Sequence, residues 1–166
     1  METAARPNSY KWFWIASLWA GLAILDATQN VFAMRHEGMH HAWMKLFIVL
    51  TLDWLPWALV TPSVISLARR YPPAWKSPQT WLLHGGVIVA VDVLASAWRS
   101  ALEVVFQPWL PDFESQAFLV TWPLKIAGGL LPAFILYAVI LAVTYVLDSK
   151  ARAAAQQTDT ARLNEQ

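Results

Sequence analysis

Four stretches of this chain are long and apolar enough to be interpreted as membrane-crossing helices. A helix needs roughly 20 mainly apolar residues to cross the hydrocarbon core of a bilayer. Each stretch reaches that length with only a few polar positions, and the four run over residues 12–33, 46–68, 81–106 and 126–147. The pattern therefore predicts an all-α fold, an integral membrane bundle of four helices.

Prolines interrupt the second stretch, which ends at a basic pair. Within WLPWALVTPSVISLARRYPP (residues 54–73), Pro56 and Pro62 lie between an acidic neighbour, Asp53, and the pair Arg69 and Arg70. Each proline removes one helical hydrogen bond, and the closing Pro-Pro stops the helix. We therefore predict a bendable helix that ends in a tight, basic turn.

Composition places the chain in the membrane class and excludes several others. Hydrophobic residues make up 57% of its 166 residues and charged residues only 14%, with eleven tryptophans. The absence of cysteine excludes disulfides and thiolate chemistry. A net charge of +1 gives no reason to expect a nucleic-acid partner. The basic N-terminus and first apolar run resemble a signal peptide, but QNVFAM lacks a small-x-small cleavage site, so we expect an uncleaved first span.

Lysine and arginine are distributed unevenly between the connections, which predicts orientation. The N-terminal tail, the second connection and the start of the C-terminal tail together hold Arg6, Lys11, Arg69, Arg70, Lys76, Lys150 and Arg152. The first and third connections hold Arg35, Lys45 and Lys125. We therefore expect a multi-pass membrane protein with both termini cytoplasmic. Asp112 in the third connection is expected to begin a short interfacial helix.

Five charged residues lie inside the apolar stretches: Asp26, Asp53, Asp92, Arg99 and Glu103. Ionisable residues in a bilayer are costly and are candidate functional sites. On the third helix Asp92, Ser96, Arg99 and Glu103 are spaced 4, 3 and 4 apart, so they share one face, from mid-membrane to the outer boundary.

Two interpretations of these charges remain open at this point. In the first, Arg99 pairs with Glu103 at i,i+4, Asp26 caps or meets a neighbouring helix, and the cluster holds helix register. In the second, they line an outward-open polar cavity that receives a small ligand, an ion or a change in the envelope. The two can coexist, because a ligand can rearrange a charge network that holds one helix arrangement.

The first connection contains three histidines, which are weak candidates for a metal site. His36 and His40 have the i,i+4 spacing that binds zinc or copper on a helix, and His41 is adjacent. Gly38 interrupts the helix between them, so we expect no metal and no cofactor. A pH-sensing role for these histidines is the other option. His84, just inside the third span, is expected to be buried or interfacial.

After Leu147 the chain becomes rich in Ala, Gln and Arg, which favour helix. It forms either a frayed tail or a rigid continuation of the last crossing. The expected organisation is a cytoplasmic tail over residues 1–11, a four-span transmembrane domain over 12–147, and a cytoplasmic connecting helix over 148–166.

Residues 46–166 resemble the membrane portion of LytS/YehU-type sensor histidine kinases, including the AlgZ-like ones. The resemblance rests on a Trp-Ala-Leu-x-Thr-Pro segment, a Leu-Ala-Arg-Arg-aromatic-Pro turn, and a last crossing that leads into a helix of the ARAAAQQTDTARLNEQ type. The first two are matched by Trp57, Ala58, Leu59, Thr61, Pro62, Leu67, Ala68, Arg69, Arg70, Tyr71 and Pro72, and Tyr137 and Tyr145 lie in the last crossing.

The resemblance implies a homodimeric sensory module of the bacterial inner membrane that relays an envelope or small-ligand signal to a kinase core and its response regulator. No histidine follows His84 and no glycine follows Gly129, so the phosphoacceptor box and the ATP-binding lid of the family are not in this sequence, and it is not expected to act as an enzyme by itself. The alternatives are a small transporter or channel lined by the same charges, and a membrane anchor subunit.

Overall fold

The computed structural model describes residues 9–73, 77–109 and 117–164, and every regular element in these ranges is an α-helix. The helices are α1 (Ser9–His36), α2 (Trp43–Leu52), α3 (Leu55–Arg70), α4 (Pro78–Phe106) and α5 (Phe118–Asn164). The predicted all-α class is confirmed. Arg6, Lys76 and Asp112, on which predictions were made, lie outside the described residues.

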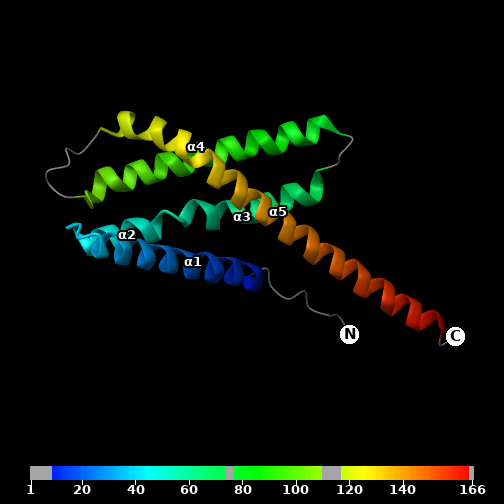
Figure 1. Cartoon of the computed structure of the whole chain (residues 1–166). Coiled ribbons are helices and arrows are strands. Elements are labelled where there is room, and N and C mark those ends of the chain that lie inside the picture. The colour runs from blue at the N-terminus through cyan, green and yellow to red at the C-terminus, as the bar shows by residue number, and fades with distance from the viewer. Residues whose placement is uncertain (1–8, 74–76, 110–116, 165–166) are drawn as a thin grey trace.

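Three helical segments of the described chain are long and apolar enough to cross a membrane: Trp43–Arg70, Pro78–Phe106 and Phe118–Thr158. The first of these comprises α2 and α3 together. The chain folds back and forth (Figure 1), so that the end of α1, the start of α2, the end of α4 and the start of α5 lie at one end of the molecule. The red end of α5 extends past the other helices at the opposite end.

Helix α1 is not among the three segments, although four crossings were predicted. Its tryptophans and its polar residues Asp26, Gln29 and Asn30 lower its mean hydropathy. One face is nevertheless buried: Trp19, Ala23 and Ala27 recur every four residues and are at most 5% exposed. The small alanines permit close packing of α1 against α2, as in membrane helix pairs. A crossing along α1 stays a prediction.

The predicted second helix is divided at Asp53 and Trp54, next to Pro56. Because Pro56 has no amide hydrogen, the carbonyl of Leu52 lacks its usual helical donor. The indole Nε1 of Trp98 on α4 donates to that carbonyl at 2.8 Å. Pro62 lies inside α3 without dividing it. The break is therefore at the first proline only, and a side chain from another helix satisfies the freed carbonyl.

The main core lies where α1, α3, α4 and α5 meet. It contains Trp19, Trp57, Val64, Ile88, Val91, Ala133, Tyr137 and Ile140. The Trp19 indole stacks on Trp57 and donates to Oγ1 of Thr61 at 2.9 Å. Since buried indole N–H groups need an acceptor, this bond ties α1 to α3 at a defined register.

Helix α5 runs without interruption from the last predicted span through the C-terminal tail, so of the two options for the tail the structure has the continuous helix. Arg69 at the end of α3 holds it with a bidentate ion pair, Nε and Nη2 lying 3.1 and 2.8 Å from the two oxygens of Asp148. Beyond this pair, residues 149–158 are all exposed. The segment from Ser149 to Asn164 projects about 24 Å as a helix.

Candidate functional site

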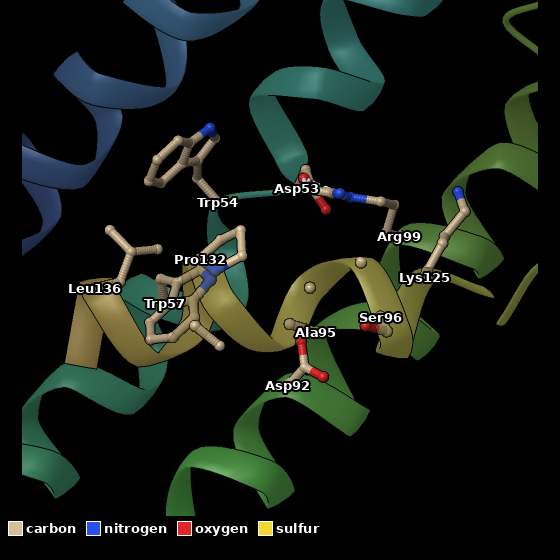
Figure 2. Close-up of a pocket in the computed structure, with 13 residues that line it drawn as sticks. Asp53, Trp54, Trp57, Asp92, Ala95, Ser96, Arg99, Lys125, Pro132 and Leu136 are labelled. Carbon is tan, nitrogen blue, oxygen red and sulfur yellow. Dashed lines mark hydrogen bonds and ion pairs between the residues drawn. The ribbon is translucent and has the colours of Figure 1, made fainter. Parts of the chain in front are cut away.

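A cavity of about 160 Å³ lies between the α2–α3 junction, α4 and α5 (Figure 2). We call it the polar cavity. Its lining consists of Asp53, Trp54, Trp57, Asp92, Ala95, Ser96, Arg99, Lys125, Gly128, Gly129, Pro132, Ala133 and Leu136. Three of the five predicted site residues, Asp53, Asp92 and Arg99, are therefore brought together around one space.

Arg99 pairs with Asp53 across helices. Its Nε donates to Oδ2 of Asp53 at 2.8 Å, and Nη2 contacts the same oxygen. Figure 2 shows the two side chains pointing toward one another. The predicted i,i+4 pair with Glu103 is therefore wrong as the principal contact of Arg99. The cross-helix pair prevails because the α2–α3 break places the largely buried carboxylate of Asp53 in direct reach of the guanidinium.

Glu103 pairs instead with Lys125 of α5. Both side chains are about one-fifth exposed, whereas the side chain of Arg99 is 51% exposed. Lys125 was placed in a connection by the sequence analysis, whereas the structure has it within α5. The signal that marks it is that Lys125 is the only charged residue between Glu114 and Asp148.

Asp92 lies at the closest approach of α4 and α5. It is 3% exposed, and its Oδ2 is buried without a hydrogen-bond partner. A methyl group added at Gly129 would lie 2.3 Å from Oδ1 of Asp92. The glycine therefore makes room for the carboxyl group. Ser96, one turn further along α4, is also buried and lines the polar cavity.

Asp26 does not line the polar cavity but connects to it through Trp54. Its Oδ2 accepts from the Trp54 indole at 3.1 Å, and its Oδ1 accepts from Nδ2 of Asn30 at 2.9 Å. The prediction that Asp26 meets a neighbouring helix is confirmed by the contact to Trp54. The acid thereby holds a cavity-lining indole in position.

The charged residues of α4 lie at different distances from its C-terminal end. Asp92 lies halfway, about 21 Å from Phe106 along the helix axis, and Arg99 and Glu103 lie about 10 and 5 Å from that end. At the same end, the amide of Ala42 donates to the carbonyl of Pro108 at 3.2 Å, which joins the first and third connections. The ion pairs thus lie between this end of α4 and the deeper Asp92.

The histidines of the first connection do not form a helical pair. His36 is the last residue of α1, and Gly38 adopts a left-handed φ of 75°. His41 instead packs edge-on against Trp43 and Trp109, with ring centroids 5.7 and 5.4 Å away. No group of three acidic or histidine side chains that could hold a metal occurs in the described part of the chain.

His84 is buried in a second polar contact, away from the polar cavity. Its Nε2 lies 2.9 Å from the carbonyl of Tyr71, which can only accept, so Nε2 carries a proton. In the neutral ring Nδ1 then accepts from the hydroxyl of Tyr137, at 2.6 Å. The prediction of a buried histidine is confirmed. It links the end of α3 to the middle of α5.

The arrangement holds charges and hydrogen-bond acceptors around a small space. Three helices supply paired charges, one unpaired carboxyl group and two indoles, which suits the binding of a small polar molecule or ion. Comparison with protein-family models, curated proteins and solved structures finds no match to this chain. The resemblance to the LytS/YehU kinases therefore stays a prediction from the sequence.

Proposed function

We propose that this chain is the sensory and signal-transducing membrane module of a LytS/YehU-like histidine kinase. The observation that carries the proposal is that one helix, α5, belongs to both ends of the molecule. Lys125, Gly128 and Gly129 line the polar cavity, and the same helix continues to Asn164 beyond the other helices. A change in the cavity can thereby reach an exposed helical end.

The proposed topology has four crossings, with both termini in the cytoplasm of a bacterium and the polar cavity in the outer half of the inner membrane. Support for α1 as the fourth crossing comes from its outward side chains, since Phe13, Trp14, Leu18, Leu22, Ile24, Leu25 and Phe32 are all exposed. Large apolar side chains exposed along a whole helix are suited to lipid contact. The uneven distribution of lysine and arginine supports the orientation.

The proposed mechanism is a small rotation or slide of α5 against the α5 of a second copy. Polar contacts along its length hold α5 in register, among them Lys125 to Glu103, Tyr137 to His84, and Asp148 to Arg69. Because α5 is one helix, displacement at the cavity is transmitted past these contacts to residues 149–158. A kinase core and its response regulator would receive the signal.

A transporter or channel lined by the same charges is the alternative. It needs a polar path through the whole membrane, but the stretches 12–25, 55–68, 78–91 and 126–147 contain no Asp, Glu, Lys or Arg. His84 is the one histidine in these stretches, and both its nitrogens are engaged. This pattern favours sensing over permeation. If the chain were only a membrane anchor, changing the ion pairs would not affect α5.

Disulfide cross-linking in membranes tests the proposal, because the chain has no native cysteine. Single cysteines are placed at residues 149–158, and dimer formation is measured in wild type and in Arg99→Leu. A dimeric α5 gives maxima every three to four residues. Arg99→Leu leaves Asp53 without its partner and is expected to shift those maxima.

Two controls separate a cavity effect from damage. Arg35→Leu removes an arginine near the same end that stacks on Trp43 outside the cavity, and should leave the pattern unchanged. Asp53→Asn combined with Arg99→Gln keeps a neutral hydrogen bond and tests whether charge itself matters. Absence of cross-linking throughout the scan contradicts the dimer, and an identical pattern in all variants contradicts signal transmission.

A further inference from the structure

We infer that the polar cavity binds a small organic cation, a primary ammonium ion, with the carboxylate of Asp92 as its counter-charge. The inference deepens the proposed function by naming the ligand class of the same site. Only the consequence of binding, a signal passed along α5, rests on that proposed function. The binding itself is inferred from the residues that line the cavity.

Charge counting around the cavity leaves an excess of acid. The cluster contains the acids Asp26, Asp53, Asp92 and Glu103 and the bases Arg99 and Lys125. Both bases are engaged in ion pairs, with Asp53 and Glu103. Asp26 is served by two neutral N–H donors. Asp26 and Asp92 thus both lack a charged partner in direct contact, and of these two acids it is Asp92 that has a buried carboxyl oxygen without any donor.

Burial makes the position of Asp92 costly without a partner. It is 3% exposed, its Oδ2 is buried without a donor, and the residue belongs to the lining of the cavity together with Ser96. An ionised, unpaired carboxylate in an apolar interior is strongly disfavoured. It must therefore take up a proton or receive a cation. Because Asp92 lines the cavity, a cation held there can serve as its partner.

The rest of the lining suits an ammonium group. Pro132 has no amide hydrogen, so the carbonyl of Gly128 lacks its helical donor, and both residues line the cavity. With Asp92 and Ser96 this provides acceptors for the three N–H donors of an ammonium. Trp54 and Trp57 add aromatic rings, which attract organic cations. A transition metal is not favoured, because the described residues contain no cluster of three ligands.

Size limits the ligand to a few heavy atoms. The cavity of about 160 Å³ is far larger than the ~10–15 Å³ that holds one water. It is smaller than the roughly 300–1,000 Å³ of pockets that bind drug-sized molecules. A short alkylammonium ion fits this range, whereas a peptide or a lipid headgroup with its chains does not.

Isothermal titration calorimetry on the full chain in nanodiscs tests the inference, with ethylammonium chloride in an amine-free buffer as probe. We expect saturable binding to wild type and at least about tenfold weaker binding to Asp92→Asn, the effect of losing a charge-assisted hydrogen bond. Asp148→Asn removes a distant, ion-paired carboxylate and should bind as wild type does. Ethanol, which is neutral and similar in size, should not bind.

Three results would overturn the inference. The first is equal binding of ethylammonium to wild type and to Asp92→Asn. The second is binding of sodium chloride without binding of ethylammonium. The third is an infrared band of a protonated carboxyl group that is absent from Asp92→Asn but persists in wild type at saturating ethylammonium. A melting curve for Asp92→Asn like that of wild type shows that lost binding does not reflect unfolding. Ethylammonium binding without any change in α5 cross-linking would support the ligand class and contradict the signalling proposal.

Discussion

A single methyl group at Gly129 should disturb the contact between α4 and α5, whereas the same change at Gly128 should not. The added Cβ at Gly129 would lie 2.3 Å from Oδ1 of Asp92, far inside van der Waals contact. The Cβ at Gly128 would meet nothing within 4 Å. The two adjacent glycines therefore form a matched pair, with equal change in composition and unequal steric consequence.

The expected magnitude follows from two opposing effects. Replacing a helical glycine with alanine stabilises the helix by about 0.5–1 kcal/mol. Overpacking at a buried site costs about 1–3 kcal/mol. Gly128→Ala should show only the gain in helix stability, whereas Gly129→Ala should show that gain together with the cost of overpacking. The two variants should therefore differ by about 1–3 kcal/mol in free energy of unfolding. The lower end applies if the side chain of Asp92 rotates into the cavity.

Denaturant unfolding in detergent micelles, followed by tryptophan fluorescence and circular dichroism, measures this difference. A double-mutant cycle then isolates the contact, because Asp92→Ala removes the atom that is hit. In that background Gly129→Ala should become as stabilising as Gly128→Ala. Equal stability of the two alanine variants with Asp92 present would refute the close approach of α4 and α5 at this position.

Two other contacts between helices give predictions of similar size. Tyr137→Phe removes the hydroxyl that donates to His84 and should lower the free energy of unfolding by about 1–3 kcal/mol. As a control, Tyr145→Phe changes a tyrosine that is 71% exposed and should have no effect in the same unfolding experiment. Trp98→Phe removes the donor to the carbonyl freed by Pro56 and should cost a similar amount. In a Pro56→Ala background that cost should shrink, since an amide donor returns; an undiminished cost would show that the indole acts through packing alone.

The charge cluster illustrates how far sequence reasoning reaches. The 4-3-4 spacing correctly predicted that Asp92, Ser96 and Arg99 share one face of α4, because helical geometry is local. It did not predict the partner of Arg99, since an i,i+4 relation shows only that two side chains can meet. Lys125 was missed because the last span was expected to begin at Ile126, whereas α5 begins at Phe118.

The apolar pattern by itself determined the all-helical class and where apolar helices occur along the chain, since both depend on residues near in sequence. The face that Asp92, Ser96 and Arg99 share on α4 belongs to the same category. Tertiary structure alone decided which acid meets which base, which carbonyl Trp98 satisfies, and that Asp92 lies against Gly129 without a donor for one of its oxygens. These outcomes depend on how helices distant in sequence pack, and no local periodicity encodes that choice.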